Sequence, residues 1–418
     1  MRASHIKVGQ LLKETKTKIT NRQFLTSPLY RGFLADMAEA TGNRYKKPIR
    51  IQLDWNSKED ADVAFTDGNV IYINSANPMT KKLPTRELKH KSLIGLLAHE
   101  VGHILFSDFD GLAAFTDAIK DGRWWPSAPI WENEIEDIAY QEIHEVFWET
   151  DEAKKKRALT LLSNIAGLVL NILEDVYIEA QMCHRFPGTY KTGIELVVGQ
   201  LLENMDALSD MVDKEDVQPL SIAFSLILQY ARSGDINNPD EIDNEYTEAL
   251  NRCLSYIDDS VYADDVNQRY FAANKIILNL WPFIKQALKN VEDEEESGSG
   301  SKGSPCEDSD STSDSSVTIG LAGDSDSEDD SSDSDSSGDA DTALQELLEQ
   351  LGKIAEKAGA TAQPLGVNAP INLGPVSLLP ESRGSSGADI NADTGSISAV
   401  IGAADSDGME NKVQCHRR

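Results

Sequence analysis

His99, Glu100 and His103 form the pattern His-Glu-x-x-His, with Gly102 just before the second histidine. On a helix, side chains four residues apart lie on one face, so both imidazoles can bind a single metal ion. Glu100 lies near that face and can accept a proton from a metal-bound water molecule. Two imidazole ligands and one carboxylate base are typical of hydrolysis at zinc. The spacing therefore predicts a zinc site with Glu100 as its general base.

The residues around this motif predict a buried helix. Aliphatic side chains recur there at helical spacing, namely Leu93, Ile94, Leu96, Leu97, Val101, Ile104 and Leu105. Gly102 is a poor helix former that costs about 1 kcal/mol relative to alanine. Its place beside a ligand predicts that another element approaches the helix closely there.

A catalytic zinc ion needs a third protein ligand and keeps one position open for water. The best source is the segment Asn171–Glu179, where carboxylates interrupt an apolar helix. Buried carboxylates are costly unless they are paired or bind a metal. We predict Glu174 as the third ligand, with Asp175 or Asn171 orienting a ligand imidazole.

Two alternatives stay open for this segment. In the first, Asp175 is the ligand and Glu179, four residues later, supports it. In the second, the segment is a solvated acidic face with structural ion pairs. Another acidic stretch runs from Glu132 to Glu145 and includes His144. Its pattern is that of an exposed face, and the tryptophans around it are more typical of a core or a cleft wall than of a ligand cage.

Upstream residues predict a small sheet that leads into the motif helix. Residues 27–42 have a helical pattern, residues 49–55 alternate as a half-buried strand, and residues 64–74 predict a hairpin. We expect a type I′ turn at Asp67-Gly68. A sheet followed directly by a His-Glu-x-x-His helix is the order of elements in zincins. By that analogy, Val70–Asn74 lines the cleft and pairs with an extended substrate.

Downstream of the motif the pattern is helical, with long helices expected at residues 161–183, 220–230 and 270–291. The expected fold is α+β and helix-dominated: a zincin-like core with a small N-terminal sheet, the motif helix and a helical C-terminal subdomain. This folded part covers residues 1–290.

The remaining sequence is acidic and low in complexity. The chain has a net charge of −31, and residues 292–341 hold eighteen Asp or Glu against one Lys. Such a composition cannot bury enough apolar surface to fold. We expect a disordered acidic Ser/Asp-rich linker at 291–342, a short amphipathic helix at 343–357, and a disordered tail at 358–418.

Composition also restricts the location of the protein and its partners. The four cysteines, Cys183, Cys253, Cys306 and Cys415, have no disulfide or metal-ligand spacing, which suits a reducing compartment. The N-terminus lacks the apolar stretch of a signal peptide, and we find no membrane-spanning segment. The strong acidity argues against nucleic-acid binding. We expect a cytoplasmic protein.

The motif His99–His103 followed by Ile104–Phe109, together with Asn171–Asp175 and Ile178-Glu179, resembles a group of metallopeptidase-like proteins. These usually join this domain to a C-terminal von Willebrand factor A domain through an acidic linker. Phage-encoded versions and the T subunit of aerobic cobaltochelatase look alike in this layout. The resemblance covers about residues 25–200. It implies a zinc peptidase, in the host cytoplasm if phage-encoded, with an AAA+ ATPase or a von Willebrand factor A protein as partner.

The chain departs from this family at its C-terminal end. A von Willebrand factor A domain needs the metal motif Asp-x-Ser-x-Ser. The stretch Asp393–Ser398 has Gly395 and Ile397 at the serine positions. We therefore expect this domain to be absent from the chain, which puts any role with an AAA+ motor or in metal-chelatase assembly in doubt.

The resulting functional hypothesis is zinc-dependent hydrolysis of a polypeptide. His99, His103 and Glu174 hold Zn²⁺, and Glu100 deprotonates the attacking water. The candidates for an oxyanion donor, by proximity in sequence alone, are Tyr177, Tyr190, His184 and Arg185. The alternative is a non-catalytic, metal-stabilised scaffold that docks a partner. The presence of Glu100 favours the enzyme, because a structural site needs no base. A third interpretation, an acidic mimic of nucleic acid, depends on the acidic run alone.

Overall fold

The computed structural model describes residues 3–13, 19–58, 63–214, 217–298 and 337–357. Within these residues helices dominate and there is one three-stranded sheet, so the predicted α+β, helix-dominated class is confirmed. The acidic segment 299–336, the tail 358–418 and the stretch Asp393–Ser398 lie outside the described residues.

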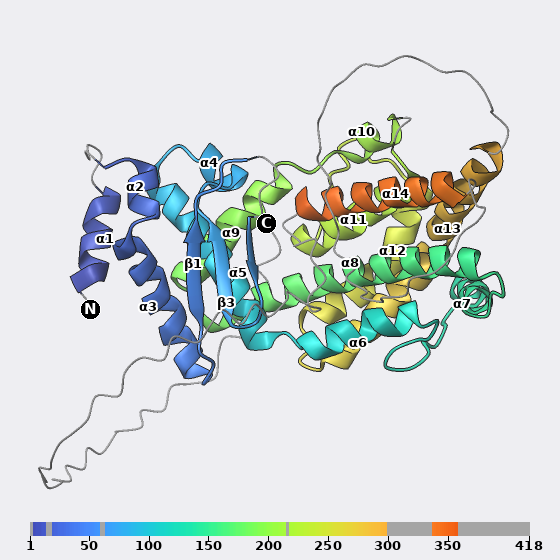
Figure 1. Cartoon of the computed structure of the whole chain (residues 1–418), viewed down its shortest axis with the longest axis horizontal. Helices are drawn as coiled ribbons and strands as arrows, with labels where there is room; N and C mark the ends of the chain where they lie inside the picture. Colours follow the sequence, from blue (N-terminus) through green and yellow to red (C-terminus); the bar gives the residue numbers. More distant parts are fainter. Residues whose placement is uncertain (1–2, 14–18, 59–62, 215–216, 299–336, 358–418) are drawn as a thin grey trace, which may run out of the picture.

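Figure 1 shows the arrangement of the elements. The N-terminal helices are α1 (Ala3–Lys13), α2 (Asn21–Leu25), α3 (Pro28–Arg44), α4 (Pro78–Lys82) and α5 (Arg86–Phe106). The helices that follow are α6 (Phe109–Lys120), α7 (Glu134–Phe147), α8 (Glu152–Arg185), α9 (Thr189–Leu202), α10 (Leu208–Val212), α11 (Pro219–Ser233), α12 (Glu245–Val261), α13 (Val266–Gly298) and α14 (Ser337–Lys357).

The sheet has the strand order β1-β3-β2. Strand β1 (Arg50–Asp54) runs parallel to β3 (Val70–Asn74), and β2 (Ala64–Thr66) pairs antiparallel with β3. The predicted strand at 49–55 and the predicted hairpin are confirmed. The predicted type I′ turn is wrong, because such a turn needs a positive φ at both central residues. Of Asp67 and Gly68, only Gly68 has one, at +88°.

The position of β3 corrects a second expectation. Strand β3 lies in the middle of the sheet, with β1 hydrogen-bonded on one side and β2 on the other. Its backbone groups are therefore already paired, and it cannot receive an extended substrate by strand addition. Among the described strands, only β1 and β2 have an outer edge.

Two hydrophobic cores lie side by side in the molecule. One joins α1–α3, the sheet, α5 and α9, and includes Ile71, Ile73 and Leu97. The other is purely helical and is built from α6–α8 and α10–α14. Helix α8 contributes to both, with residues up to Val176 in the helical core and Met182 and Cys183 in the sheet core. The part of α8 between Val176 and Met182 therefore lies at the junction of the two cores.

Helix α8 also has the length and composition of a membrane-spanning helix. Its 18-residue apolar window has a mean hydropathy of 1.5, and 83% of that window is buried inside the protein. No 18-residue apolar segment was expected from the sequence. The core helix of a water-soluble protein has the same features, and α8 is buried on both sides of the junction.

Helix α14 packs against the helical core. The predicted helix at 343–357 lies within α14, and the sequence offered no partner for its apolar face. In the structure α14 contacts α8, α11 and α13. Leu344, Leu347 and Leu351 are buried there, with Leu351 fully inaccessible. Burial of one such side chain stabilises the fold by about 1.5–3 kcal/mol, so α14 contributes to the stability of the domain.

We expect Leu351→Ala to lower the free energy of unfolding by about 2–5 kcal/mol, because it leaves a cavity in a packed core. The matched control is Glu346→Ala on the exposed face of the same helix, which should change that free energy by less than about 0.5 kcal/mol. Chemical denaturation of the full chain measures both. Equal, small effects would mean that α14 does not pack on the core in solution.

Candidate metal centre

The two motif histidines face each other from adjacent turns of α5. The helix begins after Thr85, whose hydroxyl accepts a hydrogen bond from Leu88 N–H, and it ends at Ser107. The Nε2 atoms of His99 and His103 lie 3.2 Å apart. His99 is 8% exposed and His103 is 1% exposed. The four-residue spacing thus brings both imidazoles to one buried point.

Gly102 allows α8 to approach this point closely. A Cβ atom at Gly102 would lie 3.1 Å from both Ile178 Cδ1 and Met182 Cγ, and 3.2 Å from Ile178 Cβ. A side chain at this position would be in tighter contact than ordinary packing, so its neighbours on α8 would have to shift. The close approach predicted from this glycine is therefore present, and the approaching element is α8.

Asp175 of α8 completes a group of three potential ligands. Its Oδ1 atom lies 3.1 Å from His103 Nε2 and 3.7 Å from His99 Nε2. The three side chains are buried and their ligand atoms lie within 4.8 Å of one another. Asp175 Oδ1 is fully buried and makes no hydrogen bond. A buried carboxylate oxygen in this state is costly unless a cation lies beside it, so the group fits a metal ion.

The third position differs from the sequence expectation. Glu174 points away from the imidazoles, and its Oε2 accepts a 2.6 Å hydrogen bond from Arg269 Nε. The Arg269 guanidinium also lies over the Tyr177 ring, 3.7 Å from its centroid. Consecutive helical residues project about 100° apart, so only one of Glu174 and Asp175 can face α5. The structure places Asp175 there, which agrees with the first alternative as regards Asp175.

Each imidazole is held through its other nitrogen. His99 Nδ1 lies 2.9 Å from Glu179 Oε1, and His103 Nδ1 lies 3.0 Å from Ser107 Oγ. A carboxylate at Nδ1 keeps the proton on that atom and leaves the Nε2 lone pair for a metal. Glu179 therefore contacts the His99 imidazole, whereas the first alternative had it supporting Asp175. Asn171 lies one turn before Asp175 and is also buried.

Arg232 of α11 joins the two carboxylates of α8. Its Nη2 donates a 2.7 Å hydrogen bond to Asp175 Oδ2, and its Nη1 lies 2.9 Å from Glu179 Oε1. All three side chains are at least 95% buried. Neither Arg232 nor Ser107 was predicted from the sequence as a residue of the site. A single arginine at the end of the apolar helix 219–233 was the available signal for Arg232, and the four-residue spacing from His103 was the signal for Ser107.

The charges around His99 favour a positive ion. Burial alone lowers the pKa of His99, but the carboxylates of Asp175, Glu179 and Glu100 outweigh burial and raise this pKa to about 9. Glu100 is 2% exposed. Burial raises the pKa of Glu100, while His99 and His103 act in the opposite direction. Glu100 is thus a buried carboxyl group next to the two imidazoles.

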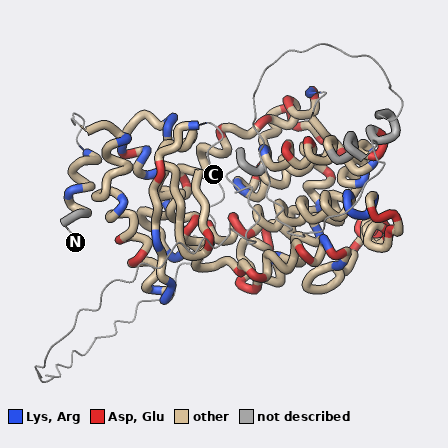
Figure 2. Tube along the Cα trace, viewed as in Figure 1, with Lys and Arg blue, Asp and Glu red and all other residues tan. Residues whose placement is uncertain are grey.

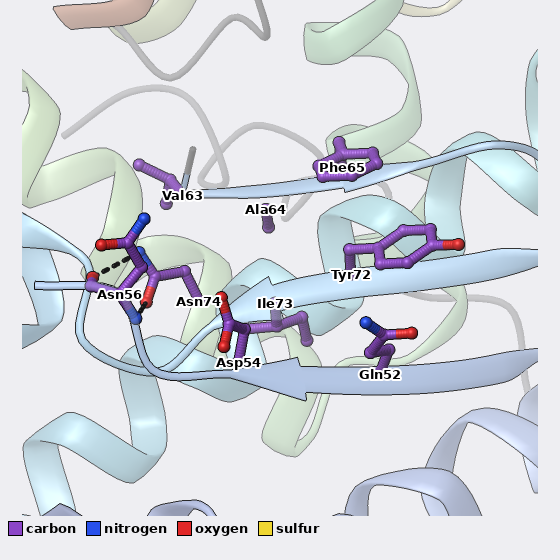
Figure 3. Close-up of a pocket in the computed structure, with 9 residues that line it drawn as sticks. All are labelled: Gln52, Asp54, Asn56, Val63, Ala64, Phe65, Tyr72, Ile73 and Asn74. Atoms are coloured by element: carbon purple, nitrogen blue, oxygen red, sulfur yellow. Dashed lines mark hydrogen bonds between the residues drawn. The ribbon is translucent and has the colours of Figure 1, made fainter. Parts of the chain in front are cut away.

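The site is enclosed. Glu100, His103 and Asp175 are each at most 2% exposed, so the edge of His99 is the main contact of the group with solvent. A pocket lies elsewhere, on the open face of the sheet. Figure 3 shows its lining side chains, among them Gln52, Tyr72 and Phe65 in a row across the three strands. None of the potential metal ligands lines this pocket.

Three of the four side chains considered as oxyanion donors have other contacts, and the fourth is exposed. The Tyr190 hydroxyl lies 3.1 Å from the Thr41 hydroxyl, and Tyr177 lies beneath Arg269. Arg185 lies over a phenylalanine ring, with its guanidinium 5.1 Å from the Phe106 centroid. His184 is exposed. These contacts do not direct any of the four towards the imidazoles.

Comparison of the chain with protein-family models, with curated proteins and with solved structures finds no match. The interpretation of the site therefore depends on its motif and its geometry.

We expect Arg232→Met to weaken metal binding by about 10–100-fold, the usual cost of losing a contact that supports a ligand. Without the guanidinium, Asp175 loses its hydrogen-bond donor, and Glu179 loses the charge that balances it. Competition with a chromogenic chelator measures the affinity. The control is Arg252→Met on α12, which removes a half-buried arginine bonded to Asn279. Equal affinities of the two variants would show that Arg232 does not position the ligands.

Proposed function

We propose that this protein is a zinc-dependent peptidase of the zincin type, with His99, His103 and Asp175 as zinc ligands and Glu100 as general base. The observation that carries the proposal is the convergence of three ligand atoms at separations of 3.1, 3.2 and 3.7 Å. Tetrahedral zinc, with bonds of about 2.0–2.1 Å, requires separations of about 3.3 Å between its ligand atoms. Two imidazoles and one carboxylate are also a donor set that zinc accepts.

Bound zinc would supply a Lewis acid that lowers the pKa of water and polarises a peptide carbonyl. The remaining chemistry belongs to the chain. Glu100 takes the proton of the attacking water on its carboxylate and returns it to the leaving amine. The contacts of Glu179, Ser107 and Arg232 fix the ligands, so that the site is organised before the substrate arrives.

The same residues support the resemblance to the metallopeptidase-like group with acidic linkers, now with the aspartate of the Asn-x-x-Glu-Asp block as ligand. On this basis the substrate is a polypeptide. A partner such as an AAA+ ATPase or a separate von Willebrand factor A protein follows from the resemblance alone.

A non-catalytic, metal-stabilised scaffold is the second candidate, because the site is enclosed. The side chains of the three potential ligands are at most 8% exposed. They can therefore hold a metal between the two cores at a place that a peptide does not reach. The group joins α5 of the sheet core to α8, which contributes to both cores, so such a metal would link the two cores. Glu100 distinguishes the two functions, since a scaffold has no use for a base.

Metal analysis combined with digestion of casein tests the proposal. The purified full chain is expected to contain about one zinc per chain, to cleave casein, to lose cleavage on chelation and to regain it with zinc. Circular dichroism before and after chelation shows whether the fold is retained. Stoichiometric zinc without cleavage of casein or of a peptide library would favour the scaffold. A folded chain that binds no zinc would overturn both.

A further inference from the structure

A row of aromatic rings lies along helix α7 and just beyond its two ends. The ring centroids of Trp131 and Tyr140 lie 4.9 Å apart, those of Tyr140 and His144 lie 6.2 Å apart, and those of His144 and Trp148 lie 6.1 Å apart. The last three residues follow at four-residue spacing and so form one stripe along the helix. We call these four residues the aromatic row.

Three residues of the aromatic row and several neighbours are open to solvent, while Tyr140 is half-buried. Trp148 is 73% exposed, Trp131 43% and Ile138 51%, and Ile130 and Ile135 are also exposed. Single exposed apolar residues are ordinary on a protein surface, but a contiguous group of this size marks an interaction site. The expectation that these tryptophans pack in a core or a cleft wall is correct for Trp124, which contacts the helical core. It is wrong for Trp148.

The same surface is strongly acidic. Residues 124–153 contain nine Asp or Glu and no Lys or Arg, and a basic run, residues 154–157, follows directly in α8. Figure 2 shows the acidic residues gathered at α7. Helix α13 pairs with three of them: Lys275 pairs with the fully buried Glu136 and lies 3.9 Å from Glu132, and Lys285 lies 2.6 Å from Glu142. The buried state of Glu136 departs from the exposed face predicted for this stretch.

The acidic side chains that stay exposed lie next to the apolar ones. Glu134, Ile138 and Glu145 follow at spacings of four and seven residues, which places them on one outward stripe of α7. Glu134 and Glu145 are exposed, and within the described part of the chain neither side chain makes an ion pair or a hydrogen bond. Two unpaired carboxylates thus border a large apolar surface.

We propose that the outer face of α7 is a docking surface for a basic, apolar polypeptide segment of a partner protein. Guanidinium and ammonium groups of the partner stack on Trp131 and Trp148. The aliphatic stems of the same side chains cover Ile138, as arginine and lysine commonly do on apolar surfaces. Their charges lie against Glu134 and Glu145.

The charge of this surface excludes the other occupants. In a symmetric contact between two copies, the acidic face of one copy would lie against the same acidic face of the other. The repulsion between like charges would destabilise such a dimer. Nucleic acids and anionic membranes are repelled by the same carboxylates. A partner that combines positive charge with apolar side chains is the chemistry that complements the surface.

A pair of synthetic helical peptides tests the proposal. One has leucine and lysine in an amphipathic pattern, and the other has glutamate at every lysine position. Fluorescence anisotropy of the labelled peptides measures binding to the full-length protein. We expect binding of the lysine peptide alone, weakening as the salt is raised from about 50 to about 200 mM. Equal binding of both peptides, or of neither, would overturn the proposal.

Surface variants locate the binding. The double variant Ile138→Ser/Trp148→Ser should bind the lysine peptide at least about tenfold more weakly. Glu134→Gln/Glu145→Gln should weaken binding and reduce its dependence on salt. The control is Ile6→Ser/Glu39→Gln, which removes one exposed apolar and one acidic residue at α1 and α3, at the opposite end of the molecule in Figure 1.

The variants change exposed side chains only, and circular dichroism and metal content should match the wild type. If the control variant loses as much affinity as the α7 variants, the peptide binds to the protein's overall charge and the docking surface is refuted. If light scattering shows that the wild type self-associates and that Ile138→Ser/Trp148→Ser does not, α7 is an interface between copies and the proposal fails.

Discussion

Asp175→Ala is expected to abolish stoichiometric zinc binding, whereas Glu174→Gln is expected to leave it intact. Asp175 Oδ1 faces both imidazole Nε2 atoms, while the Glu174 carboxylate is held by Arg269. Without Asp175 only two ligands remain, and two ligands seldom hold zinc. The loss in affinity should therefore exceed the about 10–100-fold that a lost supporting contact costs. Metal analysis after dialysis against a weak chelator measures it.

Glu174 is replaced by glutamine, and not by alanine, so that Arg269 keeps a hydrogen-bond partner. Glutamine keeps an oxygen that can accept the hydrogen bond from Arg269, so the buried guanidinium is not left without a partner. We expect Glu174→Gln to lower the melting temperature, because it removes the charge that balances Arg269. If Glu174→Gln lost zinc and Asp175→Ala retained it, Glu174 would be the ligand and the orientation of α8 described above would be incorrect.

The local parts of the site were predictable from the sequence, and the distant parts were not. The four-residue spacing of His99 and His103 fixes their common face through helix geometry alone. The choice between Glu174 and Asp175 depends on how α8 is rotated about its axis. Arg269 binds Glu174 from 95 residues further along the chain, and Arg232 binds Asp175 from 57 residues further along. No pattern within the segment 171–179 contains that information.

In the fold, too, the local elements were predictable from the sequence and the long-range pairings were not. The hairpin of β2 and β3 is local, and its turn residues and alternating pattern predicted it. The pairing of β1 with β3 is parallel and follows from a chain crossover, so the central position of β3 could not be derived from the strand patterns. The partners of α14 are equally remote, since its apolar stripe at Leu344, Leu347 and Leu351 indicates that the helix packs but not where.

Glu100→Gln is expected to retain zinc and the native fold while it lowers kcat for peptide hydrolysis by about 10²–10⁴-fold, the usual contribution of a general base. Glutamine has nearly the same shape as glutamate but cannot accept the proton of the attacking water. The zinc content should not change, because Glu100 is not among the three potential ligands. Kinetic assays on a cleavable peptide and metal analysis of the same samples measure both quantities.

The matched control is Glu87→Gln, an exposed glutamate in the first turn of the same helix. It should leave zinc content, fold and kcat unchanged, because Glu87 is three helical turns from the motif. A loss of zinc in Glu100→Gln would make Glu100 part of the metal-binding group. If Glu100→Gln cleaved peptides as fast as the wild type, the base would have to be another residue. If neither protein cleaved any peptide while both bound zinc, the metal would serve to hold α5 and α8 together at the junction of the two cores.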